Sequence, residues 1–244
     1  MHTPTPTQLL QVWERGGGSS AAARGLLLLD SSCDECSAAT LAALPLGRRD
    51  ALLLALRERL FGSALDVVAT CPQCATTVEA TFRCDDLRLA DPPAVASTLE
   101  HVAHGMRVQF RLPDSNDLLA LEDCRDAAAA RERLLERCVL HAQRDDEAHD
   151  VGAVPQALQA ELAQAMAQAD PQADLQLAFR CPNCAHAWQP LFDIARFLWQ
   201  ELHAWALHML REVDTLAAAY HWAEGDILAM SPRRRQAYLE LCAP

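Results

Sequence analysis

Aromatic residues and positive charge are both scarce in this 244-residue chain. Phe, Trp and Tyr together make up 5% of the residues, whereas Ala and Leu supply much of a hydrophobic content of 51%. This composition favours helices. Arg and Lys number 21 against 33 Asp and Glu, which gives a formal net charge of −12 at pH 7. Because nucleic-acid binding needs a cationic surface, the charge balance argues against it as a general activity.

Long apolar runs and an export signal are also lacking. The apolar run that ends at Leu29 is cut short by Asp30, and no stretch approaches the roughly 20 residues of a membrane-spanning helix. Residues 1–12 contain neither a basic nor an apolar signal region, so we expect no signal peptide. Ten cysteines without such a signal indicate a reducing cytoplasm, where thiols stay free or bind metal.

Signatures of common catalytic sites are missing as well. The chain has no G-x-x-x-x-G-K-[ST] phosphate loop, no G-x-S-x-G nucleophile elbow, no H-E-x-x-H helix and no G-x-G-x-x-G dinucleotide loop. We therefore predict that the protein is not an enzyme and has no small-molecule substrate. Binding to other macromolecules is then its expected activity.

The most informative feature that is present is a repeated Cys-Pro-x-Cys motif. Cys71-Pro72-Gln73-Cys74 precedes a strand-like run at residues 77–82, and Cys181-Pro182-Asn183-Cys184 follows one at residues 175–179. Four thiolates in two such hairpins are the ligand set of a closed, tetrahedral structural zinc site. The sequence predicts that one Zn²⁺ joins these two distant parts of the chain. The predicted ligands are Cys71, Cys74, Cys181 and Cys184.

Other interpretations of these motifs remain open. The two pairs could stay reduced and bind nothing. A thioredoxin-type site needs a strand-to-helix junction at the motif, which the neighbouring strands do not favour. Zinc knuckles often have Gly after the second Cys because the turn needs a positive φ, whereas this chain has Ala75 and Ala185. His186 is a competing ligand. A zinc hydrolase is disfavoured because four Cys ligands leave no open coordination position.

A third C-x-x-C, Cys33-Asp34-Glu35-Cys36, lacks the proline and lies between predicted helices. We interpret it as a helix cap and loop, with a second metal half-site as the alternative. Cys84, Cys124 and Cys138 are expected to be buried apolar residues rather than ligands.

The apolar spacing predicts a mostly helical α+β fold packed around a small zinc-ribbon-like β element. The strongest helical pattern covers residues 193–222, and residues 107–112 alternate as a strand does. Further helices are expected at residues 8–14, 45–61, 118–123, 127–143 and 155–169, and residues 21–29 are ambiguous. The predicted organisation is an N-terminal helical segment (1–64), a first ribbon half (65–90), a mainly helical insertion with a strand (91–172), a second ribbon half (173–192) and a C-terminal long helix followed by a short one (193–244).

Both ends of the chain and the two motifs resemble a known family. The resemblance is carried by Leu44-Pro45-Leu46-Gly47-Arg48-Arg49-Asp50-Ala51-Leu52-Leu53, by Leu60-Phe61-Gly62, by Glu212-Val213-Asp214-Thr215-Leu216-Ala217 and by Ala219-Tyr220-His221-Trp222. In these segments the chain is similar to the baseplate or hub-assembly proteins of T-even-type phages and related contractile injection systems. His221 stands where we expect Gly. The resemblance implies a role in tail structure or assembly, without catalytic residues to carry over.

Two kinds of function therefore remain. The leading hypothesis is a structural or assembly component of a contractile tail baseplate, whose partners are other baseplate or tail proteins. The alternative is a stand-alone zinc-ribbon adaptor or regulatory protein that docks onto a larger complex. Both hypotheses predict a cytoplasmic protein. The baseplate hypothesis also predicts that the protein is incorporated into a phage-like particle. Predicted contact residues are Trp199, Tyr220, Trp222, Arg233, Arg234 and Arg235.

Overall fold

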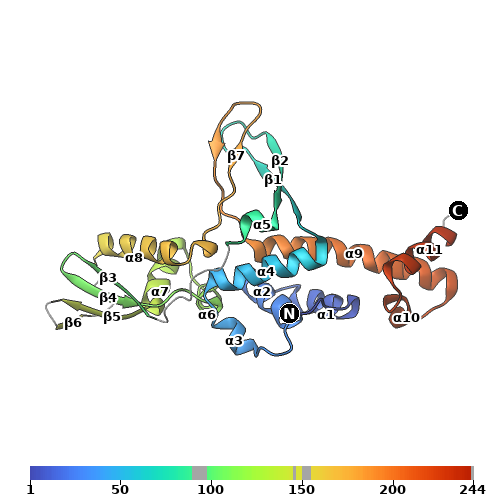
Figure 1. Cartoon of the computed structure of the whole chain (residues 1–244), viewed down its shortest axis with the longest axis horizontal. Coiled ribbons are helices and arrows are strands. Elements are labelled where there is room, and N and C mark those ends of the chain that lie inside the picture. Colours follow the sequence, from blue (N-terminus) through green and yellow to red (C-terminus); the bar gives the residue numbers. More distant parts are fainter. Residues whose placement is uncertain (90–97, 145–146, 150–154, 243–244) are drawn as a thin grey trace. The chain divides into compact units, whose positions relative to one another are not determined.

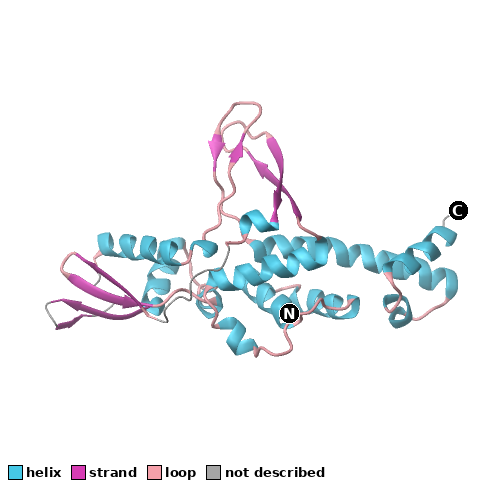
Figure 2. Ribbon diagram, in the orientation of Figure 1, coloured by secondary structure: helices cyan, strands magenta, loops and turns pink. Residues whose placement is uncertain are grey.

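The computed structural model describes residues 1–89, 98–144, 147–149 and 155–242, shown in Figures 1 and 2. The fold is α+β, with 55% helix and small sheets. It divides into two compact units, which are Met1–Cys36 with Ala195–Pro244, and Ser37–Ile194. The boundary predicted near residue 90 lies outside the described residues.

Helices are the only regular elements among the described residues of the first unit. Thr5 and Gln8 form a capping box at the start of its first helix, and Ser20 caps the second, which satisfies the free N–H groups there. The ambiguous run at residues 21–29 is therefore a helix. The predicted helix at residues 193–222 is confirmed with slightly different ends. The helices are α1 (Pro6–Gly16), α2 (Ala21–Asp30), α9 (Ile194–Tyr220), α10 (Glu224–Leu228) and α11 (Pro232–Cys242).

The core of this unit lies where α1, α9 and α10 meet. Leu10, Ala206, Met209 and Leu228 are buried together. Partly buried Trp13, Trp205 and Val213 pack around them. The final helix is fixed to α9 by Arg235, whose guanidinium is buried and forms an ion pair with Glu212.

The second unit contains the shorter helices and all the described strands. Helix α4 buries Leu53, Leu54 and Leu56 completely and ends before Gly62, whose φ of 88° suits glycine. The Gly47 N–H donates to the Asp170 carboxylate at 2.8 Å, and a Cβ at position 47 would collide with that carboxylate. The helices are α3 (Ala38–Ala42), α4 (Leu46–Phe61), α5 (Cys84–Leu87), α6 (Ser115–Ala120), α7 (Ala127–Cys138), α8 (Gln156–Ala169) and the 3-10 turn η2 (Pro171–Ala173).

A four-stranded antiparallel sheet follows the order β3-β4-β5-β6. Its strands are β3 (Leu99–Ala103), β4 (Met106–Phe110), β5 (Val139–Arg144) and β6 (Glu147–His149). One face carries Met106, Val108 and Phe110, which pack with Leu158 and Leu162 of α8 in a buried core. This face alternates with a polar one, as expected for a sheet covered by helices on one side.

Two expectations about this region were wrong. The helix predicted over residues 127–143 ends at Cys138, and β5 begins at Val139 and pairs with β4. Only one strand was expected in the insertion, but four strands lie within its described part. Pairing with a neighbouring strand outweighed the local helical pattern, which carries no information about distant partners.

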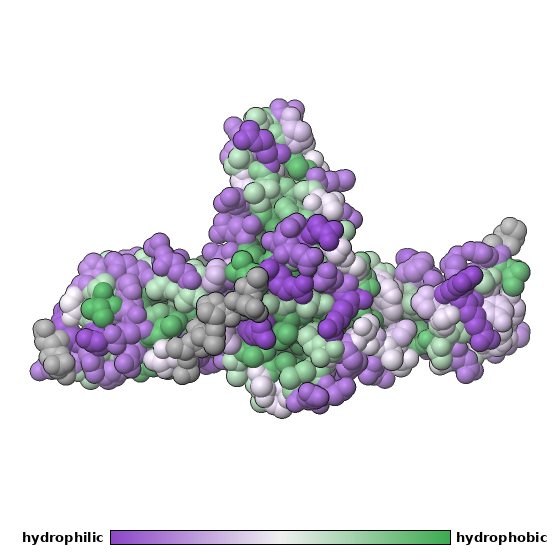
Figure 3. All heavy atoms as spheres, in the orientation of Figure 1, coloured by the Kyte–Doolittle hydropathy of each residue, from purple (hydrophilic) through white to green (hydrophobic). Residues whose placement is uncertain are grey.

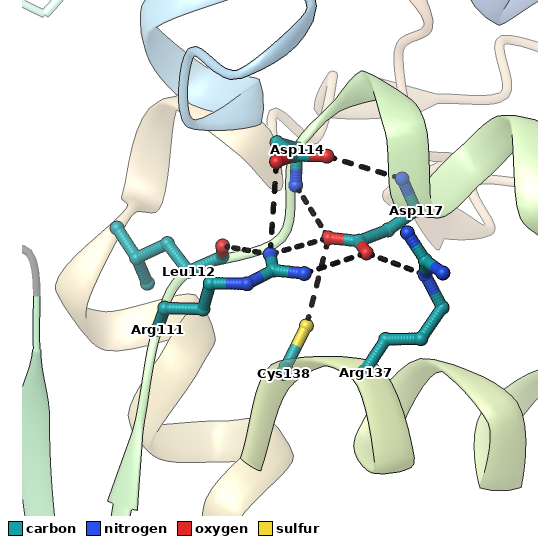
Figure 4. Close-up of polar contacts among 6 residues, drawn as sticks. All are labelled: Arg111, Leu112, Asp114, Asp117, Arg137 and Cys138. Atoms are coloured by element: carbon teal, nitrogen blue, oxygen red, sulfur yellow. Dashed lines mark hydrogen bonds and ion pairs between the residues drawn. The ribbon is translucent and has the colours of Figure 1, made fainter. Parts of the chain in front are cut away.

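A buried carboxylate joins the end of β4 to α6 and α7 (Figure 4). The Asp117 side chain is fully buried and receives hydrogen bonds from Arg111 at 2.6 and 2.8 Å and from Arg137 at 2.7 Å. Its Oδ2 also accepts the Asp114 backbone N–H at 2.9 Å. Both carboxylate oxygens are therefore paired, as a buried charge requires.

Candidate metal centre

Two antiparallel hairpins, far apart in the sequence, lie side by side in the second unit (Figure 1). The first consists of β1 (Ala64–Thr70) and β2 (Thr77–Arg83), and the second of β7 (Phe179–Arg180) and β8 (Ala187–Trp188). The rings of Phe82 and Phe179 meet edge to face with centroids 5.7 Å apart, and Phe179 stacks on Trp188 at 5.3 Å. The contact between Phe82 and Phe179 joins the two hairpins, and the stack of Phe179 on Trp188 lies within the second.

Each Cys-Pro-x-Cys motif forms the turn of its hairpin, and the two turns have nearly the same geometry. The Cys71 N–H donates to the Thr76 carbonyl at 2.9 Å, as the Cys181 N–H does to the His186 carbonyl at 2.8 Å. Ala75 and Ala185 have φ values of 58° and 59°. Both alanines therefore adopt the left-handed conformation that glycine usually occupies in such turns.

The turns bring the four predicted cysteines together. Their sulfur atoms all lie within 4.8 Å of one another, with 3.7 Å between Cys71 and Cys184 and 3.5 Å between Cys74 and Cys181. Four sulfurs about 2.3 Å from a central ion would be separated by about 3.8 Å in a regular tetrahedron. A disulfide would need sulfurs about 2.05 Å apart, and all four cysteines are free. The cluster can therefore bind a metal ion.

Hydrogen bonds near the sulfurs favour one thiolate in particular. Bonds from the Thr76 side chain and backbone, helped by Asn183, lower the pKa of Cys74 to about 5 despite partial burial. A hydrogen bond with the His186 backbone lowers the pKa of the Cys184 thiol. Burial and hydrogen bonds with the other three cysteines outweigh this effect and raise the pKa to about 12. Cys74 is thus readily ionised, whereas Cys184 resists ionisation, which a bound cation would promote.

The remaining candidate ligands lie outside this cluster. The His186 ring stacks on Trp188, with centroids 6.1 Å apart. Cys33 and Cys36 are half-buried, and a hydrogen bond with Cys33 raises the pKa of Cys36. Cys84 and Cys138 are fully buried. Within the described residues, the four cysteines of the two hairpins are the one group of three or more potential ligands at this spacing.

The predicted contact residues differ in their exposure. Trp199 is buried, and the Arg24 guanidinium lies over its ring at 4.5 Å. Arg235 is also buried, whereas Arg233 and Arg234 are exposed. Tyr220 and Trp222 are half-buried and stack with centroids 4.4 Å apart. Sequence reasoning missed Tyr238, which packs edge-on against both rings.

Sequence reasoning also missed the residues that support the sulfur cluster. Thr76 and Asn183 lie next to the cysteines, so their position beside a thiolate could have suggested hydrogen bonds to sulfur. The ring contact between Phe82 and Phe179 joins separate hairpins, and nothing local in the sequence indicates it.

Comparison with known proteins now places the chain in a family. Residues 21–199 match the family described as T4 bacteriophage base plate protein. The chain belongs to this family. The matched segment contains all four clustered cysteines and supports a structural role in the phage baseplate. No curated protein and no solved structure matches the chain. No described helix combines the length and hydropathy that a bilayer crossing requires.

Replacing Ala75 and Ala185 together by Gly is expected to stabilise the folded baseplate protein. The left-handed conformation costs a non-glycine residue about 1–2 kcal/mol, and the greater backbone freedom of Gly in the unfolded chain offsets about 0.4–1 kcal/mol of that gain. We expect a net gain of about 0.5–1 kcal/mol per site, measured by urea unfolding. Ala69→Gly, within β1, is the control and should destabilise the protein. Loss of stability in the double variant would show that the turns are not strained.

Proposed function

We propose that this protein is a structural or assembly component of a phage-like contractile tail baseplate, and that it acts through protein–protein contacts while zinc holds its two hairpins together. The observation that carries the proposal is the four-cysteine cluster inside the segment that matches the baseplate family. Catalysis has no part in it, because a fully thiolate-ligated ion offers no site for substrate.

The donor set favours zinc. Cysteine thiolates in two C-x-x-C turns form the ligand set of structural Zn²⁺ sites, and the sulfur separations suit tetrahedral coordination. The paired hairpins would then be a zinc ribbon whose halves come from distant parts of the chain. Because β3–β6 and α6–α8 lie between Cys74 and Cys181 in the sequence, the ion would close a long loop and restrict the unfolded chain.

The proposed contacts with other baseplate proteins lie in the C-terminal region, between Trp199 and Leu241. Trp222 and the exposed Arg233 and Arg234 remain candidates for direct contact. The buried Trp199 and Arg235 would instead support the surface from within. We propose that the protein folds in the cytoplasm, where thiols stay reduced for zinc, and then joins the particle.

Deleting residues 225–244 tests the proposed contact region. The truncated protein should bind as much zinc as the wild type but fail to enter, or to mature, the contractile particle. Zinc is measured by elemental analysis, and incorporation by immunoblotting of purified particles. Because the deletion removes the buried Leu228, a full-length Trp222→Ala, Tyr238→Ala variant serves as the second arm. Functional particles containing normal amounts of both variants would move the interface to residues 92–170.

A further inference from the structure

Arg233, Arg234 and Arg235 are consecutive residues of α11, so their side chains point in different directions. Successive residues of a helix point about 100° apart, so all three side chains cannot face the same neighbour. Arg235 is buried and pairs with Glu212, and its Nη1 also reaches the Met230 carbonyl. Arg233 and Arg234 are exposed. One arginine therefore fixes the helix, and two are left at the surface.

An aromatic cluster lies beside Arg234, the second of these two exposed arginines. The rings of Tyr220, Trp222 and Tyr238 contact one another, with centroids 4.4 to 5.6 Å apart. The Arg234 guanidinium lies over the Tyr238 ring at 5.7 Å. All three aromatic side chains are half-buried, so they offer rigid apolar edges that need little further ordering on binding. We call Trp222, Arg233, Arg234 and Tyr238 the basic–aromatic surface.

The basic–aromatic surface runs against the charge of the chain. The formal net charge is −12, yet no carboxylate among the described residues forms an ion pair with Arg233 or Arg234, although most other ion pairs involve arginine. Figure 3 shows strongly hydrophilic side chains at its right, over α10 and α11, where α10 carries the acidic Glu224 and Asp226 and α11 carries the arginines. The chain contains 21 arginines and no lysine, and Arg binds carboxylates bidentately.

The geometry points to a docking site for an acidic segment of a partner protein, in which two carboxylates pair with Arg233 and Arg234 and an apolar side chain packs on Trp222 and Tyr238. This inference rests on the proposed function, because it names the chemistry of the partner that the C-terminal region contacts. Arg and aromatic residues are the side chains most enriched at the centres of protein interfaces.

A protein segment fits this surface better than a nucleic acid does. Two guanidinium groups can neutralise only two phosphates. The other phosphates of a nucleic acid would be repelled by a chain whose net charge is −12. A short acidic segment brings few charges and contributes apolar contacts that phosphates lack.

Fluorescence anisotropy with a labelled Glu-rich peptide containing interspersed Leu tests the inference. We expect binding that weakens as salt is added, and at least about a tenfold loss of affinity in Arg233→Glu, Arg234→Glu. The control Arg15→Glu, Arg48→Glu changes the net charge equally at two exposed sites and should bind as the wild type does. Equal binding of a peptide with Gln in place of Glu, equal losses in both variants, or tighter binding of oligothymidylate would overturn the inference.

Particle incorporation separates this inference from the function on which it rests. If deletion of residues 225–244 abolishes incorporation and Arg233→Glu, Arg234→Glu does so as well, both stand. If the deletion abolishes incorporation but the double variant enters particles normally, the contact region stands and the acidic partner is rejected.

Discussion

Removal of the proposed zinc ion is expected to have the largest effect on the folded protein. Chelation, or Cys71→Ser, should lower the melting temperature steeply and expose hydrophobic surface that binds a fluorescent dye. Apparent zinc-binding free energies of structural sites are about 10–16 kcal/mol in isolated peptides. We therefore expect each treatment to remove on the order of 5 kcal/mol from the stability of the second unit, measured by urea unfolding with and without chelator.

The reason is that the hairpins have little core of their own. Leu65 is the one buried residue of β1, and no residue of β2 is buried. Val68 is 64% exposed. Two-stranded hairpins are marginally stable in water, so the proposed zinc would supply much of their stability, together with the contact between the Phe82 and Phe179 rings.

Cys33→Ser is the matched control for Cys71→Ser. It removes one thiol from a C-x-x-C motif outside the cluster and should leave both the zinc content and the melting temperature nearly unchanged. Comparable losses from the two substitutions would show that the Cys33-Cys36 motif contributes as much to the fold as the four-cysteine cluster does, and would contradict this prediction.

Asp117→Asn is expected to have the second-largest effect, a loss of about 3 kcal/mol. The substitution keeps the shape of the side chain but removes the charge that pairs with Arg111 and Arg137. Breaking a buried pair by removing one partner typically costs about 3–5 kcal/mol, and the lower value applies because both arginines reach solvent. Urea unfolding measures the loss, and zinc content should not change.

The same carboxylate should give the protein a distinct acid sensitivity. Burial opposes ionisation of Asp117, but hydrogen bonds from Arg111, the Asp114 backbone and Arg137 outweigh burial and lower its pKa to about 2. A lowered pKa stabilises the fold above the unfolded-state value, near 4, and this stability is lost as the pH falls from about 4 to 2. Asp117→Asn should lack that component. Asp123→Asn, at an exposed position, should retain it and unfold as the wild type does.

The four-cysteine cluster was more predictable from the sequence than the four-stranded sheet was. Ligand type and C-x-x-C spacing are local, so they indicate that Cys71 and Cys74 form half of a site. The identical internal proline of Cys181-Pro182-Asn183-Cys184 marks the partner half. The helix at residues 193–222 was equally accessible, because its apolar spacing persists over many turns.

The alternation at residues 107–112 predicted β4 (Met106–Phe110), but the other strands of the insertion were not predictable in the same way. Val139–Arg144 continues a helical pattern and becomes a strand only because β4 lies beside it. The burial of Arg235 was not predictable for a related reason. Three consecutive arginines suggest a solvated surface, and the acidic partner of the third, Glu212, lies on another helix. Contacts of this kind depend on tertiary structure, which single-sequence patterns do not contain.

Zinc K-edge X-ray absorption on the purified full-length protein, combined with elemental analysis, tests the proposed zinc centre most directly. One zinc ion per chain, surrounded by four sulfur atoms at about 2.3 Å and lost in both Cys71→Ser and Cys181→Ser, is the predicted result. Either no bound metal in protein purified under reducing conditions, or a site that persists when the cysteines of one hairpin are replaced, would contradict it.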